Sequence, residues 1–324
     1  MKLRLFMLAL VCLALGPGTF VRCAPRPIDY RSGVEATALD SAVKRVGPLE
    51  VVGMWQLKSR NTRFGGYSGL IALGDGTMFA ASDRGAGMRF ALGAGGPLGF
   101  RLAALGDPDF ARQEYSLDIE SITHDPASGQ VWLAYEGLNM VERRDAGLAH
   151  PARIRPRAMA DWGENSGPEA MLRLADRRFI ILRESRSGWF ADAFPGLLWA
   201  RDPLDGEEPV EFAFAVPDRF RPTDMAQLPD GRVLVLARRL ALGWPVFEVA
   251  LFIGDPKGIA EDKLWPLREL ARFEPPFPTD NFEGLAVDPG NGYPVTISMI
   301  SDDNGAVLQR TLLVRLRWDG KLPQ

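Results

Sequence analysis

Short apolar runs recur along the whole chain, and turns rich in glycine, proline and aspartate separate them. Runs of this length predict β-strands, because an amphipathic helix needs a 3.6-residue period over about ten or more positions. The first strand is expected at 51–57, where β-branched and aromatic residues dominate. Gly74-Asp-Gly76 and Pro229-Asp-Gly231 then form hairpin-type turns. The pattern therefore predicts an all-β protein.

The strand pattern repeats about every 50 to 60 residues. In each copy a polar residue opens a short apolar strand, a turn follows, and a second strand ends in charge. The aligned opening positions are Ser68, Glu120, Glu169, Asp224 and Glu283. A repeat of this period built from strands is typical of a β-propeller with four-stranded blades.

The repeats favour five blades. The last unit supplies only three strands before the chain ends, and the strand at 51–57 would complete it. Pairing the two ends of the chain in one blade closes the ring and removes an exposed sheet edge. The alternative is a six-bladed ring, with one blade in the longer loops or in the N-terminal arm.

The N-terminus predicts an export signal at 1–23. A basic start, Met1-Lys-Leu-Arg4, precedes an apolar run at 5–15 that is short for a membrane span. The mature chain is therefore expected in the periplasm or outside the cell, with no transmembrane span. Lipid anchoring through Cys23 is an alternative, although the preceding residues match a lipoprotein signal poorly. Residues 24–48 are predicted to form an arm or linker with a short helix at 35–45, and residues 49–320 the propeller domain.

Composition excludes several function classes. A net charge of −3 gives no basic field for nucleic acid. Cys12 lies in the predicted signal, so Cys23 has no partner for a disulfide and a cysteine-based zinc site is excluded. His124 and His150 lie in turns, where an exposed structural role is the simpler interpretation.

Charged residues occupy a second matching place in the repeats. This second set follows the second strand of each unit: Asp83, Glu136, Glu184, Arg238, and Asp302 with Asp303. The start of one strand and the end of its antiparallel hairpin partner lie at the same end of a sheet. Both sets are therefore expected at one mouth of the central channel.

Carboxylates that converge in a low-dielectric channel repel one another unless a cation or arginines neutralise them. Oxygen ligands without cysteine or histidine suit calcium, or alternatively magnesium. The predicted metal ligands are Asp83, Glu120, Glu136, Glu169, Asp224, Glu283, Asp302 and Asp303. The candidate catalytic residues are Glu120, Glu169, Asp224 and Glu283. The alternative interpretation is structural, because acidic residues at strand starts also cap turns and accept backbone hydrogen bonds.

Arginines accompany the second set, and the candidate substrate-binding residues are Arg84, Arg183, Arg238 and Arg239. Guanidinium groups bind phosphate oxygens through paired hydrogen bonds, and a neighbouring metal polarises an ester. The alternative is that these arginines only neutralise the carboxylates.

Seven motifs resemble, in their order along the chain, the bacterial family known as esterase-like activity of phytase. They are Gly66-Tyr-Ser-Gly-Leu, Ser82-Asp-Arg-Gly, Asp118-Ile-Glu-Ser-Ile, Asn165-Ser-Gly-Pro-Glu-Ala, Arg221-Pro-Thr-Asp-Met-Ala, Asn281-Phe-Glu-Gly-Leu and Ser301-Asp-Asp-Asn. The resemblance covers residues 50–318. It implies an exported, phytase-like propeller whose acidic motif residues form an active site for ester hydrolysis.

The combined expectation is a divalent-metal-dependent hydrolase of phosphoesters or related esters, acting on a small molecule. Two alternatives use the same fold. One is a lactonase or carboxylesterase of the calcium-propeller type. The other is a non-catalytic binding propeller of the cell envelope, because a fold alone does not imply catalysis.

Overall fold

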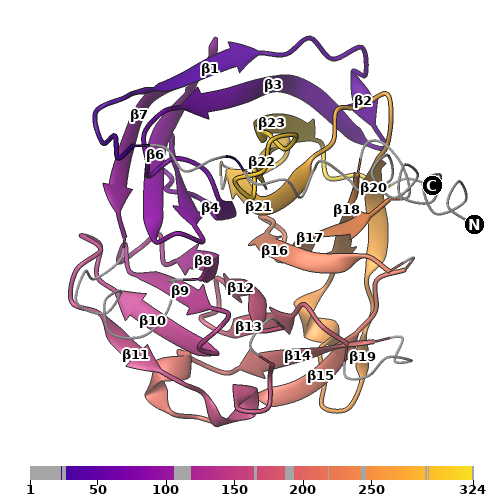
Figure 1. Ribbon diagram of the computed structural model, residues 1–324. Helices are drawn as coiled ribbons and strands as arrows, with labels where there is room; N and C mark the ends of the chain where they lie inside the picture. Colours follow the sequence, from indigo (N-terminus) through magenta and orange to yellow (C-terminus); the bar gives the residue numbers. More distant parts are fainter. Residues whose placement is uncertain are drawn as a thin grey trace, which may run out of the picture.

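Five sheets form a ring (Figure 1). Residues of their inner strands line a shared cavity, the central channel. The computed structural model describes residues 23, 27–105, 118–163, 166–186, 193–217, 219–241, 246–288, 290 and 292–322. Apart from Cys23, the predicted export signal lies outside the described residues. Among the described residues, no helix is long and apolar enough to cross a membrane. The predicted five-bladed β-propeller with four-stranded blades is confirmed.

The blades follow one another along the chain, each listed here from its inner to its outer strand. Blade 1 contains β4 (Tyr67–Ala72), β5 (Thr77–Ser82), β6 (Ala86–Gly93) and β7 (Gly96–Ala104). Blade 2 contains β8 (Ile119–His124), β9 (Val131–Tyr135), β10 (Met140–Arg144) and β11 (Ala152–Ile154). Blade 3 contains β12 (Pro168–Arg173), β13 (Phe179–Arg183), β14 (Phe194–Trp199) and β15 (Val210–Phe214), with β19 (Leu264–Trp265) added at its edge. Blade 4 contains β16 (Arg221–Gln227), β17 (Val233–Leu240), β18 (Phe247–Gly254) and β20 (Arg268–Phe273). In the described part of the chain, three short 3₁₀ helices lie between strands: η2 (Arg157–Met159), η3 (Pro203–Asp205) and η4 (Pro256–Gly258).

Blade 5 joins the two ends of the described chain. Its strands are β21 (Asn281–Asp288), β22 (Val295–Asp302), β23 (Thr311–Trp318) and β3 (Leu49–Ser59). The predicted closing strand at 51–57 is therefore β3, which runs antiparallel to β23 along most of its length. This pairing saturates the edge of β23 and holds the ring closed.

The N-terminal arm adds two more strands to blade 5. β1 (Val34–Ala38) pairs with the outer edge of β3, and β2 (Arg45–Val46) forms a hairpin with its start. The predicted helix at 35–45 is therefore wrong. An available strand edge offers this segment a full ladder of backbone hydrogen bonds, which outweighs the weak helix preference of its alanine and glutamate residues.

The apolar core is divided into five clusters, one between each pair of neighbouring blades. Successive residues of a strand point to opposite faces of the sheet. In β17, Val235 packs toward blade 3 and Leu236 toward blade 5. Both faces of each blade are thus buried, which explains the almost unbroken apolar sequences of the middle strands.

Candidate functional site

A β-bulge interrupts the inner strand of every blade at the same height. The register between the two innermost strands shifts by one residue in each blade, which leaves one extra residue on the inner strand. These extra residues are Ser68, Glu120, Glu169, Thr223 and Glu283. A bulge turns a side chain away from the regular alternation of a strand. The five positions are therefore structurally equivalent around the channel.

Blade 4 departs from the predicted alignment by one residue. The shift lies between Pro222 and Asp224, so Thr223 occupies the bulge and Asp224 follows it. Asp224 is 1% exposed. Its carboxylate accepts hydrogen bonds from the backbone N–H groups of Leu285 (2.7 Å), Met225 (2.8 Å) and, at a longer 3.4 Å, Leu70. Asp224 thus connects blade 4 to blades 5 and 1.

The second predicted set lies beside the bulges. In each blade, one residue of the second strand pairs with the inner-strand residue just before the bulge, and the next residue along the second strand is a member of this set. Asp83 follows Ser82, Glu136 follows Tyr135, and Arg238 pairs with Arg221. Glu184 and Asp302 hold the same place in blades 3 and 5. Both sets therefore meet at one end of the channel, which we call the acidic mouth.

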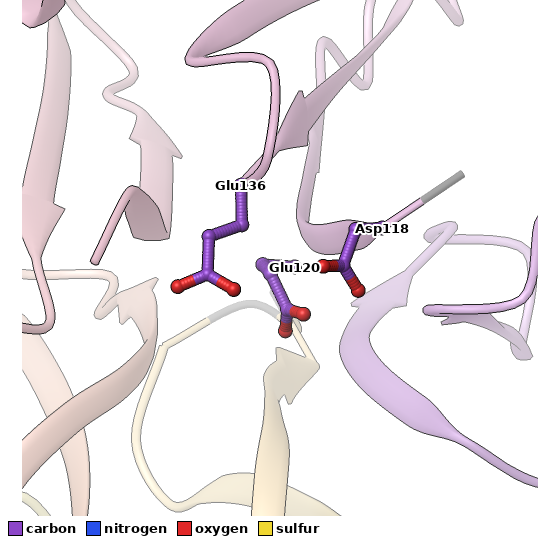
Figure 2. A group of neighbouring side chains, drawn as sticks. All are labelled: Asp118, Glu120 and Glu136. Carbon is purple, nitrogen blue, oxygen red and sulfur yellow. The ribbon is translucent and has the colours of Figure 1, made fainter. Parts of the chain in front are cut away.

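Five carboxylates of blades 2 and 3 form the densest part of the acidic mouth. Oxygens of Asp118, Glu120 and Glu136 all lie within 4.8 Å of one another, and so do oxygens of Glu136, Glu169 and Glu184. Figure 2 shows the carboxyl groups of the first three side by side. The sequence analysis quoted Asp118 in a motif but did not select it, because it precedes the strand. Its position two residues before Glu120, on the same side of an extended chain, was the available signal.

Arginines neutralise part of the mouth on the side of blades 4 and 5. Arg238 Nη2 lies 3.0 Å from Glu283 Oε1 and 3.8 Å from Glu184 Oε1. Arg221 Nη1 lies 3.2 Å from the same oxygen of Glu184. Asn281 Nδ2 also donates to Glu283 at 2.8 Å. Glu283, a predicted metal ligand, is therefore held by an arginine and an amide.

On blade 1, Arg84 lies between two acidic residues of the rim. Its Nη2 is 3.4 Å from Asp303 Oδ1, and its Nε is 3.7 Å from Asp83 Oδ1. Gly66 faces Asp83, and a Cβ at this glycine would lie 2.0 Å from Asp83 Oδ1. The backbone of Gly66 also has φ of +68°, which side chains rarely adopt. Glycine at this position therefore makes room for the carboxylate.

Two predicted arginines have other partners. Arg183 donates to the Ser166 carbonyl oxygen at 2.9 Å and lies over the Trp162 ring. Arg239 pairs with Glu248, its cross-strand neighbour on β18, at 2.5 Å. Arg238 and Arg239 are adjacent, and successive strand residues point to opposite faces. Only Arg238 of this pair contacts the mouth carboxylates among the described residues.

Burial dominates the electrostatics of the mouth. It raises the pKa of Glu120 and Glu169 well above the usual value, and neighbouring carboxylates raise it further. The same two causes raise the pKa of Glu136 to about 7 and that of Asp83, despite Arg84, to about 6. For Arg238, burial lowers the pKa, but the surrounding carboxylates outweigh burial and raise it. The mouth thus combines crowded carboxylates with a permanently charged guanidinium.

Histidine takes no part in this site. His124 ends β8 at the opposite end of the strand from Glu120. His150 is exposed and contacts Asp145 through Nδ1 at 2.6 Å. The described donor set of the mouth consists of carboxylate oxygens, which are the ligands that calcium and magnesium prefer.

Fold and site together define a five-bladed propeller with an acidic channel mouth partly neutralised by arginines. Residues 62–305 match the phytase-like family, described as esterase-like activity of phytase, and the chain belongs to this family. A comparison with curated protein sequences finds no match.

Two solved structures illustrate the comparison of folds. One is the PQQ-bound aldose sugar dehydrogenase from Streptomyces coelicolor, with a TM-score of 0.46 and 11% identity, covering 90% of this chain and 99% of that chain. The other is a chain of a nidogen/laminin complex, with a TM-score of 0.44 and 10% identity, covering 87% of this chain and 96% of that chain.

Proposed function

We propose that this protein is an exported hydrolase of phosphoesters or related esters that depends on a divalent cation, with calcium preferred over magnesium. The observation that carries the proposal is the convergence of carboxylates and guanidinium groups at one channel mouth. Membership of the phytase-like family supports ester hydrolysis as the reaction class. Carboxylates can hold a hard cation, and arginines can bind the anionic part of an ester.

The residues of the mouth fit a bound cation. Glu169 is 7% exposed and has no hydrogen bond or ion pair among the described residues, although its carboxylate lies close to those of Glu136 and Glu184. Leaving a buried carboxylate unpaired costs several kcal/mol, so a partner for it is expected. Calcium takes six to eight oxygen ligands and tolerates irregular geometry, which suits a crowded set of flexible carboxylates.

Each group of residues has a distinct role in the proposed reaction. Asp118, Glu120 and Glu136 hold the cation, which when bound polarises an ester oxygen and lowers the pKa of a coordinated water. Arg238 fixes Glu283 and stays charged, and it can stabilise negative charge that develops on the ester. Arg84 is 43% exposed and only loosely paired, so its guanidinium can turn toward an incoming anionic group.

A groove beside the mouth provides room for the rest of a substrate. It encloses about 1060 Å³, and its walls include Arg84, Asp303, Asn304 and Arg310. This volume lies at the upper end of ordinary small-molecule sites. The groove shares Arg84 and Asp303 with the rim of the mouth, so an ester bound over the carboxylates can extend into it.

A substrate screen with the purified protein tests the proposal. Aryl phosphomonoesters, aryl phosphodiesters, short-chain aryl carboxylic esters and lactones are each offered with calcium, with magnesium and with a chelator. We expect turnover of a phosphoester that the chelator abolishes. Preference for a lactone or carboxylic ester by orders of magnitude would instead support the lactonase alternative. Cation binding without turnover of any ester would support a non-catalytic propeller.

Matched variants locate the activity at the mouth. We expect Glu120→Gln to lower kcat/KM at least 10- to 100-fold, which is the usual effect of disturbing a metal site. Glu211→Gln, at an exposed position of β15, is the control and should keep full activity. Equal activity in both variants would place the chemistry elsewhere in the molecule.

Export is tested separately. We expect the chain, expressed with residues 1–23 in a Gram-negative host, to accumulate in the periplasm without this segment. The mass of the mature N-terminus identifies the cleavage site and any lipid on Cys23. Recovery of the uncleaved chain from the cytoplasm would refute export and leave the hydrolase proposal untouched.

A further inference from the structure

We propose that the acidic mouth binds two divalent cations side by side, with Glu136 as a ligand shared by both. The inference rests on the cation dependence proposed above and extends it to the number of ions and their ligands. The first position lies among Asp118, Glu120 and Glu136 on blade 2. The second lies among Glu136, Glu169 and Glu184, between blades 2 and 3.

The spacing of the carboxylates points to two positions. Ligand oxygens lie about 2.3–2.6 Å from calcium, so two ligands of one ion are at most about 5 Å apart. Each group of three satisfies this limit, because its oxygens lie within 4.8 Å of one another. In the described part of the chain the five carboxylates form two such groups, and Glu136 belongs to both. A carboxylate has two oxygens and can therefore bind two ions at once.

Glu136 is placed between the blades by its backbone and by a glycine. It follows β9 of blade 2, yet its Oε1 accepts a hydrogen bond from Gly167 N of blade 3 at 3.3 Å. A Cβ at Gly167 would lie only 2.8 Å from the carbonyl oxygen of Glu136 and 2.9 Å from its Cα. A larger residue at 167 would push the two blades apart. Glycine at 167 therefore lets blades 2 and 3 approach closely enough for Glu136 to belong to both groups of three carboxylates.

Glu169 supplies an observation independent of the spacing. Glu169 is 7% exposed as a residue, and none of the hydrogen bonds and ion pairs of the described residues involves its carboxylate, although the charge of Arg238 lowers its pKa in part. It lies on blade 3, in the second group and outside the first. A single ion at the first position would leave this carboxylate unpaired. An ion at the second position gives it the partner that its burial requires.

The balance of charges in the mouth also favours two divalent cations. The five carboxylates of the two groups carry five negative charges when ionised. Arg221 pairs with Glu184 and contributes one positive charge, whereas Arg238 lies closer to Glu283. Two divalent cations supply the remaining four charges. One cation would leave a net charge of −2 in a buried site, which is costly at low dielectric.

Two adjacent cations would refine the substrate class. Paired metal ions are suited to clamping a phosphoryl group, because both the attacking and the leaving oxygen need stabilisation. A phosphoester is therefore the preferred substrate class over a lactone, because the single carbonyl group of a lactone needs only one metal ion.

The experiment is a stoichiometry measurement on the full mature chain with calcium chloride. Isothermal titration calorimetry and native mass spectrometry count the ions bound to the wild type and to three variants. We expect two ions in the wild type and one each in Glu120→Gln and Glu169→Gln. Glu136→Gln should weaken both positions, with at least a tenfold loss of affinity at each. Circular dichroism checks that each variant is folded, and these substitutions remove repulsion rather than packing.

The outcomes separate this inference from the proposed function. One ion in the wild type, or an equal loss in Glu120→Gln and Glu169→Gln down to none, would overturn the two-ion centre and leave cation-dependent hydrolysis standing. No bound calcium or magnesium in the wild type would overturn both. Two ions in the wild type with no turnover of any ester would support the centre and refute the hydrolase.

Discussion

Asp224 offers a sharp test of how the propeller is held together, because its carboxylate bonds to backbone amides of three blades. We consider the substitution Asp224→Ala. It removes the acceptor for the N–H groups of Leu285 and Met225, at 2.7 and 2.8 Å, and for that of Leu70 at 3.4 Å. The matched control is Ser121→Ala. Ser121 holds the same position after the bulge in blade 2, and its Oγ accepts one such bond, from Met171 N at 2.8 Å.

The expected magnitudes follow from the number of amides left without an acceptor. A buried donor that loses its partner costs about 1–3 kcal/mol. Asp224→Ala abandons two short hydrogen bonds and one long one, and it also relieves the cost of burying a charge. Burial raises the pKa of Asp224 well above its usual value, although the amides act in the opposite direction. We therefore expect a net loss of about 2–4 kcal/mol for Asp224→Ala and about 1–2 kcal/mol for Ser121→Ala.

Chemical denaturation in urea, with thermal denaturation as a second measurement, compares both variants with the wild type in the presence of chelator. Asp224→Asn should recover about half of the loss, because its amide oxygen can still accept from Leu285 N. A wild-type stability for Asp224→Ala would refute the role of Asp224 as an inter-blade tie. A greater loss of unfolding free energy for Ser121→Ala than for Asp224→Ala would refute the idea that the cost rises with the number of amides left without an acceptor.

Three further predictions concern other buried charges. The raised pKa of Glu136 means that the folded, metal-free chain keeps protons that the unfolded chain has released, so its free energy of unfolding should fall by about 1–3 kcal/mol between pH 5 and pH 8. Thermal denaturation should show this fall in chelator, and its persistence in saturating calcium would contradict the cation site. Gly66→Ala should displace Asp83 and destabilise the chain by about 1–3 kcal/mol in urea, whereas Gly95→Ala, which has open space, should not. Glu142→Leu removes the carboxylate that neutralises the buried guanidinium of Arg144, so it should cost about 3–5 kcal/mol in the same assay, and a cost below 1 kcal/mol would contradict that pairing.

Much of the fold could be predicted from the sequence, because strands, turns and a repeat are local patterns. The repeat period gave the number of blades, and the unpaired strand near residue 51 gave the closure. The segment at 35–45 was misread because its conformation depends on the edge of β3, which is distant in sequence. The same limit applies to any segment whose backbone partners come from another part of the chain.

The site was predictable in outline but not in register. A bulge adds one residue to a strand, and Thr223-Asp224 offers two polar candidates for it. Alternation cannot decide between them, because the bulge itself breaks the alternation. Likewise, Arg238 and Arg239 look equivalent in sequence, but only one faces the mouth carboxylates among the described residues. These distinctions depend on cross-strand partners that only the folded sheet defines.

The five equivalent bulges also separate structure from function within the mouth. In blades 1 and 4 the bulge residue is a hydroxyl that bonds to the next blade. Ser68 donates to the Ile119 carbonyl, and Thr223 donates to the Phe282 carbonyl at 3.3 Å. A hydroxyl therefore satisfies the structural needs of this position without charge.

The other three blades carry glutamate at the same bulge, and burying these carboxylates is costly. Arg238 of blade 4 neutralises Glu283 on blade 5, but none of the hydrogen bonds and ion pairs of the described residues involves Glu169 on blade 3. If the bulge residue served only to join neighbouring blades, a hydroxyl side chain would suffice in all five blades. On the adjacent blades 2 and 3 five carboxylates gather, and of these the ion pairs of Arg221 and Arg238 reach Glu184 among the described residues, which supports the proposed cation site.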